Sequence, residues 1–157
     1  METIQYPCGR DVIERVLPHR DPVVWVSRVL ECEPGASITA ELDVDPELPL
    51  FAGHFPGHPV LPGVIIMEAL AQTASFCALV GRDEPGVLGF FAGIDKAKFR
   101  HQVQPGDVLT LKADIVKNSS RMVVADVQAL VGDQVAATAT QKYVMAKGAS
   151  GFSKGLT

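Results

Sequence analysis

Cysteine is scarce in this chain, and its few thiols lie far apart in the sequence. The three residues are Cys8, Cys32 and Cys77, and no Cys-x-x-Cys pair occurs. This number and spacing disfavour both a disulfide framework and a zinc site built on cysteine. Cys77 falls inside an apolar segment, where a free thiol acts as a small hydrophobic side chain. We therefore expect the protein to work in a reducing compartment.

Signals for export, for a membrane span and for nucleic-acid binding are weak throughout. The first residues, Met-Glu-Thr-Ile-Gln-Tyr-Pro, have neither the basic start nor the apolar core of a signal peptide. The most apolar window, residues 60–80, is interrupted by Pro62, Glu68 and Gln72, so we expect no membrane span. The net charge of −4 disfavours nucleic-acid binding through bulk charge. We expect a cytoplasmic protein whose partners are neither membranes nor nucleic acids.

Composition and length indicate one globular domain. The chain has 157 residues, of which 47% are hydrophobic and 20% are charged. This balance supports a compact core and disfavours disorder. The sequence has no internal repeat and no linker. We expect a single domain over residues 1–147, followed by a loose tail over residues 148–157.

Alternation of apolar and polar residues predicts several strands. The clearest alternation runs from Ser37 to Val44, and Gly132-Asp133 is typical of a two-residue hairpin loop. Consecutive strands on tight turns favour an antiparallel meander. A short helix is expected over residues 11–17, stopped by Pro18. The strands are expected at residues 23–30, 37–44, 109–115, 123–129 and 135–145.

One long helix is expected over residues 62–80. Pro62 suits its first turn, where the missing N–H would be unpaired in any case. Almost every following residue is apolar, and a helix that is apolar nearly all round must be buried. Together with strands that are apolar on one face, this predicts an α+β fold in which a curled antiparallel sheet wraps around one central helix.

Glu68 is the one carboxylate in this apolar helix. An acid is almost never buried without a partner or a purpose. Gln72 lies four residues further on the same face, so its amide is placed to hydrogen-bond the carboxyl group and orient it. An apolar setting favours the neutral acid, which can donate a proton. The alternative is that Glu68 faces a wet interface and pairs with an arginine.

His54 lies in a loop of few accessible conformations just before the helix. The segment 53–63 reads Gly-His-Phe-Pro-Gly-His-Pro-Val-Leu-Pro-Gly, and such a loop holds a side chain accurately. His54 is therefore a candidate general base, although a lone histidine is more often structural. His58 follows four residues later, but the intervening Phe-Pro-Gly prevents the helix that a His-x-x-x-His metal pair uses. We expect no metal here.

The start of the helix at Gly63-Val64 adds a third element. Its free N–H groups and the positive end of the helix dipole suit an oxyanion, and Gly63 lets a substrate approach the backbone closely. Base, acid and oxyanion site together suit removal of a proton beside a carbonyl and protonation of a leaving group. Every helix has such a start, so an ordinary helix terminus is the alternative.

Four segments make the chain resemble a known family. They are Leu17-Pro18-His19-Arg20, residues 53–63, Glu68-Ala69-Leu70-Ala71-Gln72 and Phe91-Ala92-Gly93-Ile94-Asp95. Together they resemble the bacterial 3-hydroxyacyl-ACP dehydratases of type II fatty acid synthesis, over about residues 10–146.

The resemblance implies a hotdog fold and the conversion of a 3-hydroxyacyl thioester to the trans-2-enoyl thioester. The substrate would arrive on the phosphopantetheine arm of acyl carrier protein, and no other cofactor would be needed. The family works as dimers, often assembled into hexamers, and each site takes its histidine from one subunit and its glutamate from the other. His54 and Glu68 match these positions. A related enzyme that also isomerises the double bond carries aspartate at the helix position, so Glu68 favours plain dehydration.

The chain departs from the family pattern at three places. Val26-Ser27-Arg28 stands where Val-Asp-Arg is usual, Ala52 replaces a common glutamine, and Trp25 adds bulk to a usually aliphatic strand. None removes a proposed catalytic group. These changes are compatible with a specialised pathway, such as polyketide or polyene assembly, that uses a different acyl chain.

Two further groups of residues are weaker candidates. Lys96, Lys98 and Arg100 alternate, so in a strand they share one face. This face either docks the acidic carrier protein or is simply solvated. Five phenylalanines either line an acyl tunnel or pack in the core: Phe51, Phe55, Phe90, Phe91 and Phe99.

Two other functions compete with dehydration. A hotdog acyl thioesterase would use a carboxylate to activate water at the same thioester, and release of free thiol would reveal it. A non-catalytic acyl-binding partner of a related subunit is the third alternative. The presence of both His54 and Glu68 argues against each.

Overall fold

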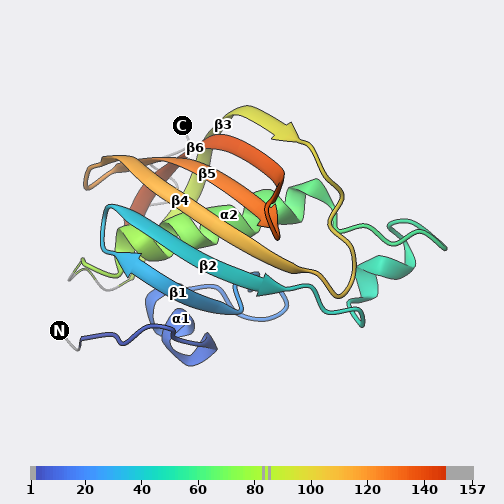
Figure 1. Cartoon of the computed structure of the whole chain (residues 1–157). Coiled ribbons are helices and arrows are strands. Elements are labelled where there is room, and N and C mark those ends of the chain that lie inside the picture. The colour runs from blue at the N-terminus through green and yellow to red at the C-terminus, as the bar shows by residue number, and fades with distance from the viewer. Residues whose placement is uncertain (1–2, 83, 85, 148–157) are drawn as a thin grey trace.

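The structure is a computed structural model that describes residues 3–82, 84 and 86–147. The predicted tail, residues 148–157, lies outside the described residues. In chain order the elements are α1 (Arg10–Val16), β1 (Arg28–Glu33), β2 (Ser37–Asp43), the 3-10 helix η1 (Pro49–Ala52), α2 (Gly63–Leu79), β3 (Val87–Phe99), β4 (Val108–Asn118), β5 (Met122–Val131) and β6 (Gln134–Lys147), as Figure 1 shows.

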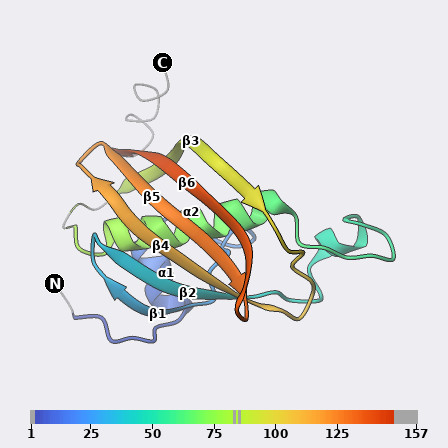
Figure 2. The ribbon, with the colours of Figure 1, turned by 45° about the horizontal axis from the view of Figure 1, so that its top comes forward.

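The strands form one antiparallel sheet in the order β1-β2-β4-β5-β6-β3. The sheet curls around α2, which runs across its concave side (Figures 1 and 2). This arrangement confirms the predicted α+β fold and the hotdog architecture. The Gly132-Asp133 hairpin is also confirmed, because Val131 pairs with Gln134 across it and Gly132 has a φ of 60°.

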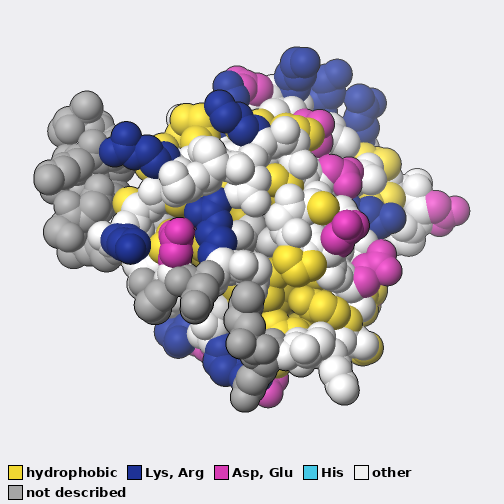
Figure 3. Space-filling view, turned by 90° about the vertical axis from the view of Figure 1, so that its left-hand side faces the viewer, with side chains coloured by type: hydrophobic (Ala, Val, Ile, Leu, Met, Phe, Trp, Pro, Cys, Tyr) yellow, Lys and Arg dark blue, Asp and Glu magenta, His cyan; other side chains and the backbone are white. Residues whose placement is uncertain are grey.

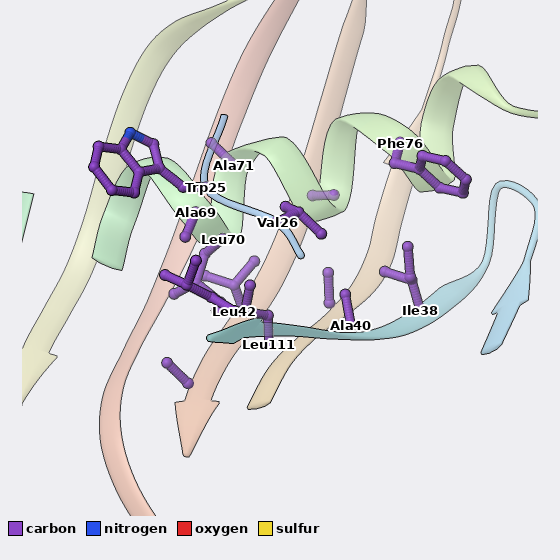
Figure 4. Packing of buried hydrophobic residues seen from close by; sticks show 14 of the residues in the cluster. Trp25, Val26, Ile38, Ala40, Leu42, Ala69, Leu70, Ala71, Phe76 and Leu111 are labelled. Carbon is purple, nitrogen blue, oxygen red and sulfur yellow. The ribbon is translucent and has the colours of Figure 1, made fainter. Parts of the chain in front are cut away.

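The core lies between α2 and the inner face of the sheet. Figure 4 shows Leu70 of α2 close to Leu42 of β2 and Leu111 of β4, with Val26 beside them. Leu70 and Leu111 are completely buried. Several buried positions of β4, β5 and β6 are alanines: Ala113, Ala125, Ala129, Ala137 and Ala139.

The predicted strand over residues 23–30 is wrong at its beginning, since β1 starts only at Arg28. Residues 23–26 run past α2 with Val24, Trp25 and Val26 buried. Two backbone groups of this segment form hydrogen bonds with one side chain of α2. Trp25 N–H donates to Gln72 Oε1 at 2.8 Å, and Val23 O accepts from Gln72 Nε2 at 2.7 Å. The apolar, β-branched pattern of these residues therefore indicates that they are buried, but not that they pair in a strand.

The departure at Ser27 is accommodated at the start of β1. Its hydroxyl oxygen accepts a hydrogen bond from Asp43 N–H at 2.9 Å, and Arg28 forms ion pairs with Glu41 and Asp43. Ser27 thus keeps an acceptor where the family usually has a carboxylate.

Charged side chains of both signs are interspersed over the end of the molecule seen in Figure 3. The view shows no extended surface of one sign, in keeping with a net charge of only −4. Within the described residues, no helix is long and apolar enough to cross a membrane.

Candidate active site

His54 is held by the backbone of its own loop. The segment between β2 and α2 projects beyond the end of the sheet (Figures 1 and 2). His54 N–H donates to Leu50 O at 3.0 Å, and His54 O accepts from Val60 N–H at 2.9 Å. Between them, Phe55 and His58 exchange backbone hydrogen bonds of 3.1 and 2.8 Å. These bonds fix the loop and with it the direction of the His54 side chain.

The imidazole of His54 is oriented by the carbonyl group of Val60. Its Nδ1 lies 2.8 Å from Val60 O. A carbonyl oxygen only accepts, so Nδ1 carries the hydrogen and Nε2 of the neutral ring keeps a free lone pair. The ring also stacks on Phe55, with centroids 4.1 Å apart. The nitrogen that can take a proton is therefore Nε2.

A cavity of about 470 Å³ lies beside His54 and the start of α2. The N–H groups of Ile65 and Ile66 donate to Pro62 O at 3.0 and 3.3 Å. Those of Gly63 and Val64 have no hydrogen-bond partner among the described residues, as expected for a helix start. The lining of the cavity includes His54, Leu61, Gly63, Phe99, Arg100 and His101.

Gly63 is in close contact with Phe99. A Cβ atom at this position would lie 2.8 Å from Phe99 Cε1, closer than real Cβ contacts. The close approach to Gly63 that the sequence suggested for a substrate is thus made here by the Phe99 ring. Phe99 as a residue is 55% exposed and lines the cavity, so it covers part of the route to the helix start.

Glu68 lies in the second turn of α2 and is less buried than expected. Its side chain is 34% exposed, although the helix is almost wholly buried from Ile66 onward. Among the described residues of one chain, the polar partners of Glu68 are a histidine and a glutamine, and none is an arginine. Glu68 Oε1 lies 3.6 Å from Nε2 of His19 and accepts a hydrogen bond from Gln72 Nε2 at 3.1 Å.

The amide of Gln72 can face Glu68 in only one orientation. Its Oε1 accepts from Trp25 N–H and its Nε2 donates to Val23 O, so exchanging oxygen and nitrogen would break both bonds. Gln72 is only 1% exposed, which makes that exchange costly. Glu68 Oε1 is therefore held as an acceptor, and a proton on the acid belongs on Oε2.

A second, small cavity of about 20 Å³ adjoins Glu68. Burial raises the pKa of the Tyr143 phenol, with a smaller contribution from Glu68, so the phenol stays protonated. Its O–H group donates a hydrogen bond to Gln141 Oε1. Gln141 in turn donates to Met67 O at 3.0 Å. The lining comprises His19, Glu68, Ala71, Gln72, Ser75, Gly89, Phe91 and Tyr143.

Sequence reasoning assigned no role to His19 or Tyr143. His19 belongs to the Leu17-Pro18-His19-Arg20 segment that carried the resemblance, but no spacing rule joins it to Glu68. Within one chain His54 and Glu68 line different cavities. A single chain therefore does not bring the proposed base and acid into one cavity.

The alternation expected for Lys96, Lys98 and Arg100 is interrupted. The pairing of β3 with β6 shifts between Asp95 and Lys98, Lys96 has a φ of 55°, and Arg100 follows the end of the strand. A bulge displaces side chains from strict two-residue alternation. All three side chains remain exposed, and Arg100 lines the cavity beside His54.

The phenylalanines have different environments. Phe51 is buried in the core, Phe90 is half-buried, and Phe55 is 53% exposed beside His54. Phe91 lines the cavity at Glu68 and Phe99 the cavity at His54.

For metals, the described residues contain no group of three His, Cys, Asp or Glu side chains able to hold an ion.

Comparison with protein families finds a match to the FabA-like domain over residues 17–140. Among curated proteins, the chain is 47% identical over 135 residues to the 3-hydroxyacyl-[acyl-carrier-protein] dehydratase FabZ of Ruminiclostridium cellulolyticum, covering 86% of this chain and 95% of that protein. It is also 47% identical over 134 residues to the FabZ of Dechloromonas aromatica, covering 82% and 93%.

Solved structures with the same fold include dehydratases and thioesterases. The dehydratase heterocomplex ApeI:P from Xenorhabdus doucetiae matches with a TM-score of 0.79 at 18% identity, over 96% of this chain and 97% of that one. A hypothetical thioesterase with coenzyme A from Streptococcus pneumoniae matches with a TM-score of 0.58 at 13% identity, over 76% and 85%. At these identities the likeness shows the fold alone.

Proposed function

This chain belongs to the FabA-like family, and we propose that it removes water from 3-hydroxyacyl thioesters carried on acyl carrier protein, giving trans-2-enoyl thioesters. The reaction is that of a hydro-lyase. The observation that carries the proposal is that His54, with Nε2 free to take a proton, lines one cavity with Gly63 at the start of α2.

His54 is the general base in this mechanism. Its Nε2 takes the proton from the carbon beside the thioester carbonyl, while Nδ1–H stays bonded to Val60 O. That bond stabilises the imidazolium as it forms. The electron pair of the broken C–H bond moves toward the carbonyl oxygen, where the N–H groups of Gly63 and Val64 offer hydrogen bonds to the developing negative charge.

Glu68 is the general acid. Its Oε1 accepts from Gln72, so Oε2 carries the proton that goes to the β-hydroxyl group. The carbon–oxygen bond then breaks, the double bond forms, and the hydroxyl leaves as water. His54 ends with one added proton and Glu68 with one fewer, and exchange with water restores both.

The active unit of this proposal is a dimer whose sites are shared. Within one chain His54 and Glu68 line different cavities. The edge strand β3 carries exposed apolar side chains, Phe91 at 36%, Ile94 at 42% and Phe99 at 55%. An exposed apolar edge strand is a ready pairing surface. Pairing of two copies near residues 89–99 would bring the His54 loop of one against Glu68 of the other, and three such dimers would give a hexamer.

Acyl carrier protein is the partner that delivers the substrate, on its phosphopantetheine arm. The exposed side chains of Lys96, Lys98 and Arg100 suit its acidic surface, and Arg100 lies at the cavity that holds His54. We place the protein in the cytoplasm, with no cofactor of its own. Phe91 and Phe99 are the phenylalanines best situated to contact an acyl chain.

Product analysis tests the reaction and separates it from thioester hydrolysis. The pure protein is incubated with 3-hydroxyacyl thioesters of several chain lengths, and products are identified by mass while free thiol is measured. Loss of 18 mass units with the thioester intact, as dehydration requires on the general-acid mechanism, supports the proposal. Release of free thiol without an enoyl product would assign the chain to the thioesterases instead.

A further inference from the structure

His19 lies beside the proposed acid but belongs to a different part of the chain. It follows α1, in a segment held by Arg20, whose guanidinium donates to Leu17 O at 2.9 Å and to His19 O at 2.6 Å. The His19 side chain is 22% exposed, and its Nε2 lies 3.6 Å from Glu68 Oε1. The backbone thus carries the imidazole to the edge of the cavity at Glu68.

The other ring nitrogen of His19 is buried without a partner. Nδ1 has no hydrogen bond among the described residues. A neutral imidazole has one N–H and one lone pair. If Nδ1 carried the hydrogen, a buried donor would be unsatisfied and the Nε2 lone pair would face the oxygen of Glu68. The favourable tautomer therefore directs Nε2–H at Glu68 and leaves the lone pair on Nδ1.

The charge state of His19 follows from its surroundings. Burial lowers its pKa, the Glu68 carboxylate raises it, and the neighbouring Arg20 lowers it again, with a net lowering. Tyr143 of β6, which lines the same cavity, stays protonated and donates a hydrogen bond to Gln141. His19 is therefore a neutral hydrogen-bond donor near pH 7. An unpaired buried nitrogen lowers stability, so packing alone does not account for histidine here.

We propose that His19 is a positioning residue for the acid: its Nε2–H, together with the amide of Gln72, holds Glu68 Oε1 and so keeps the acid's proton on Oε2. The inference rests on the proposed dehydration. The 3.6 Å separation is slightly too long for a hydrogen bond, and such contacts often shorten when substrate binds. Two donors on one oxygen leave the other oxygen as the sole site for the proton that the leaving hydroxyl needs.

The test compares His19→Leu, which fills the space without a donor, with His19→Gln, whose amide nitrogen can occupy the place of Nε2. Gln134→Leu is the control, since its exposed side chain at the start of β6 lines neither cavity. We expect His19→Leu to lower kcat about ten- to hundred-fold, by analogy with the loss seen when a group that orients a metal-binding side chain is removed. KM and the melting temperature should stay near wild type, and His19→Gln should recover most of kcat.

Each outcome decides the role of His19. A wild-type enzyme that dehydrates its substrate while His19→Leu keeps a normal kcat overturns the positioning role and leaves the proposed function standing. Loss of activity that follows a lowered melting temperature, with no recovery in His19→Gln, shows a structural role and also overturns it. Absence of dehydration by the wild type overturns both proposals.

Discussion

Trp25 and Gln72 are joined by a hydrogen bond of 2.8 Å from the Trp25 backbone N–H to Gln72 Oε1. This bond links the segment before β1 to the middle of α2. It also decides that the amide nitrogen of Gln72, and not its oxygen, faces Glu68. The orientation of the proposed acid is therefore set by the packing of a buried segment, one residue of which is a departure from the family pattern.

Replacing Gln72 should lower the stability of the fold and remove a hydrogen bond that orients Glu68. Gln72→Ala leaves the buried Trp25 N–H and the part-buried Val23 O without their side-chain partner. We expect a loss of about 1–3 kcal/mol in the free energy of unfolding, measured with denaturant, because the buried Trp25 N–H and the part-buried Val23 O lose their hydrogen bonds. Gln134→Ala, at an exposed position, is the control. A change below about 1 kcal/mol, the worth of an ordinary single hydrogen bond, would mean that water replaces the amide.

Gly63 should tolerate no side chain while Phe99 is present. Gly63→Ala places a Cβ atom 2.8 Å from the Phe99 ring, and such overpacking typically costs about 1–3 kcal/mol. The double variant Gly63→Ala/Phe99→Ala should lose less stability than the sum of the two single variants, because residues in contact are coupled. Gly53→Ala is the control, since its nearest neighbour would be 4.0 Å away. Simple additivity in the double variant would contradict the contact.

His19 should make the fold sensitive to acid. Its pKa in the folded state lies below the usual 6.5, chiefly through burial. The unfolded chain therefore binds more protons, and stability contributed by neutral His19 is present above pH 6.5 and is lost as the pH falls through the lower, folded-state value. We expect His19→Gln to flatten the fall of unfolding free energy below pH 6.5 relative to wild type. If the unfolding free energies of the two proteins fall in parallel below pH 6.5, the protonation of His19 does not contribute to the acid sensitivity.

The two proposed catalytic residues should be separable from the fold. His54→Ala and Glu68→Gln are each expected to keep the wild-type circular dichroism spectrum and to lose about a hundred- to ten-thousand-fold in turnover, the usual contribution of a general acid or base. Glu68→Asp shortens the side chain by one methylene and should retain some activity. Near-normal dehydration by a folded Glu68→Gln protein would place the acid elsewhere.

The sequence predicts the scaffold better than the site. Two-residue alternation and an apolar run located the sheet and α2, because those patterns reflect which faces are buried. The same signal failed at residues 24–26, which are buried but lie before the start of β1. It also failed for Glu68, whose side chain lies at the margin of the buried helix. The bulge near Lys96 was not predicted either, since it depends on the pairing of β3 with β6.

The contact between His19 and Glu68 could not be predicted from the sequence, because the two residues are far apart along the chain. Gln72 was found because four residues separate it from Glu68 on one helix, a distance that helix geometry fixes. His19 reaches the same carboxyl group only through the path of the chain after α1. Similarly, the sequence places His54 next to the helix, but whether it meets the Glu68 of its own chain or of another depends on assembly.

Mixing two inactive variants tests the shared site most directly. His54→Ala and Glu68→Gln proteins are dissociated, combined in equal amounts and allowed to reassociate, and dehydration is measured against each variant alone. If each site takes His54 from one subunit and Glu68 from the other, half of the dimers are mixed and each has one intact site. The mixture should then recover roughly a quarter of wild-type activity, as random pairing in a two-fold dimer requires. If both residues of a site come from the same chain, no mixed dimer contains an intact site, and a mixture that exchanges subunits yet stays inactive would contradict the account.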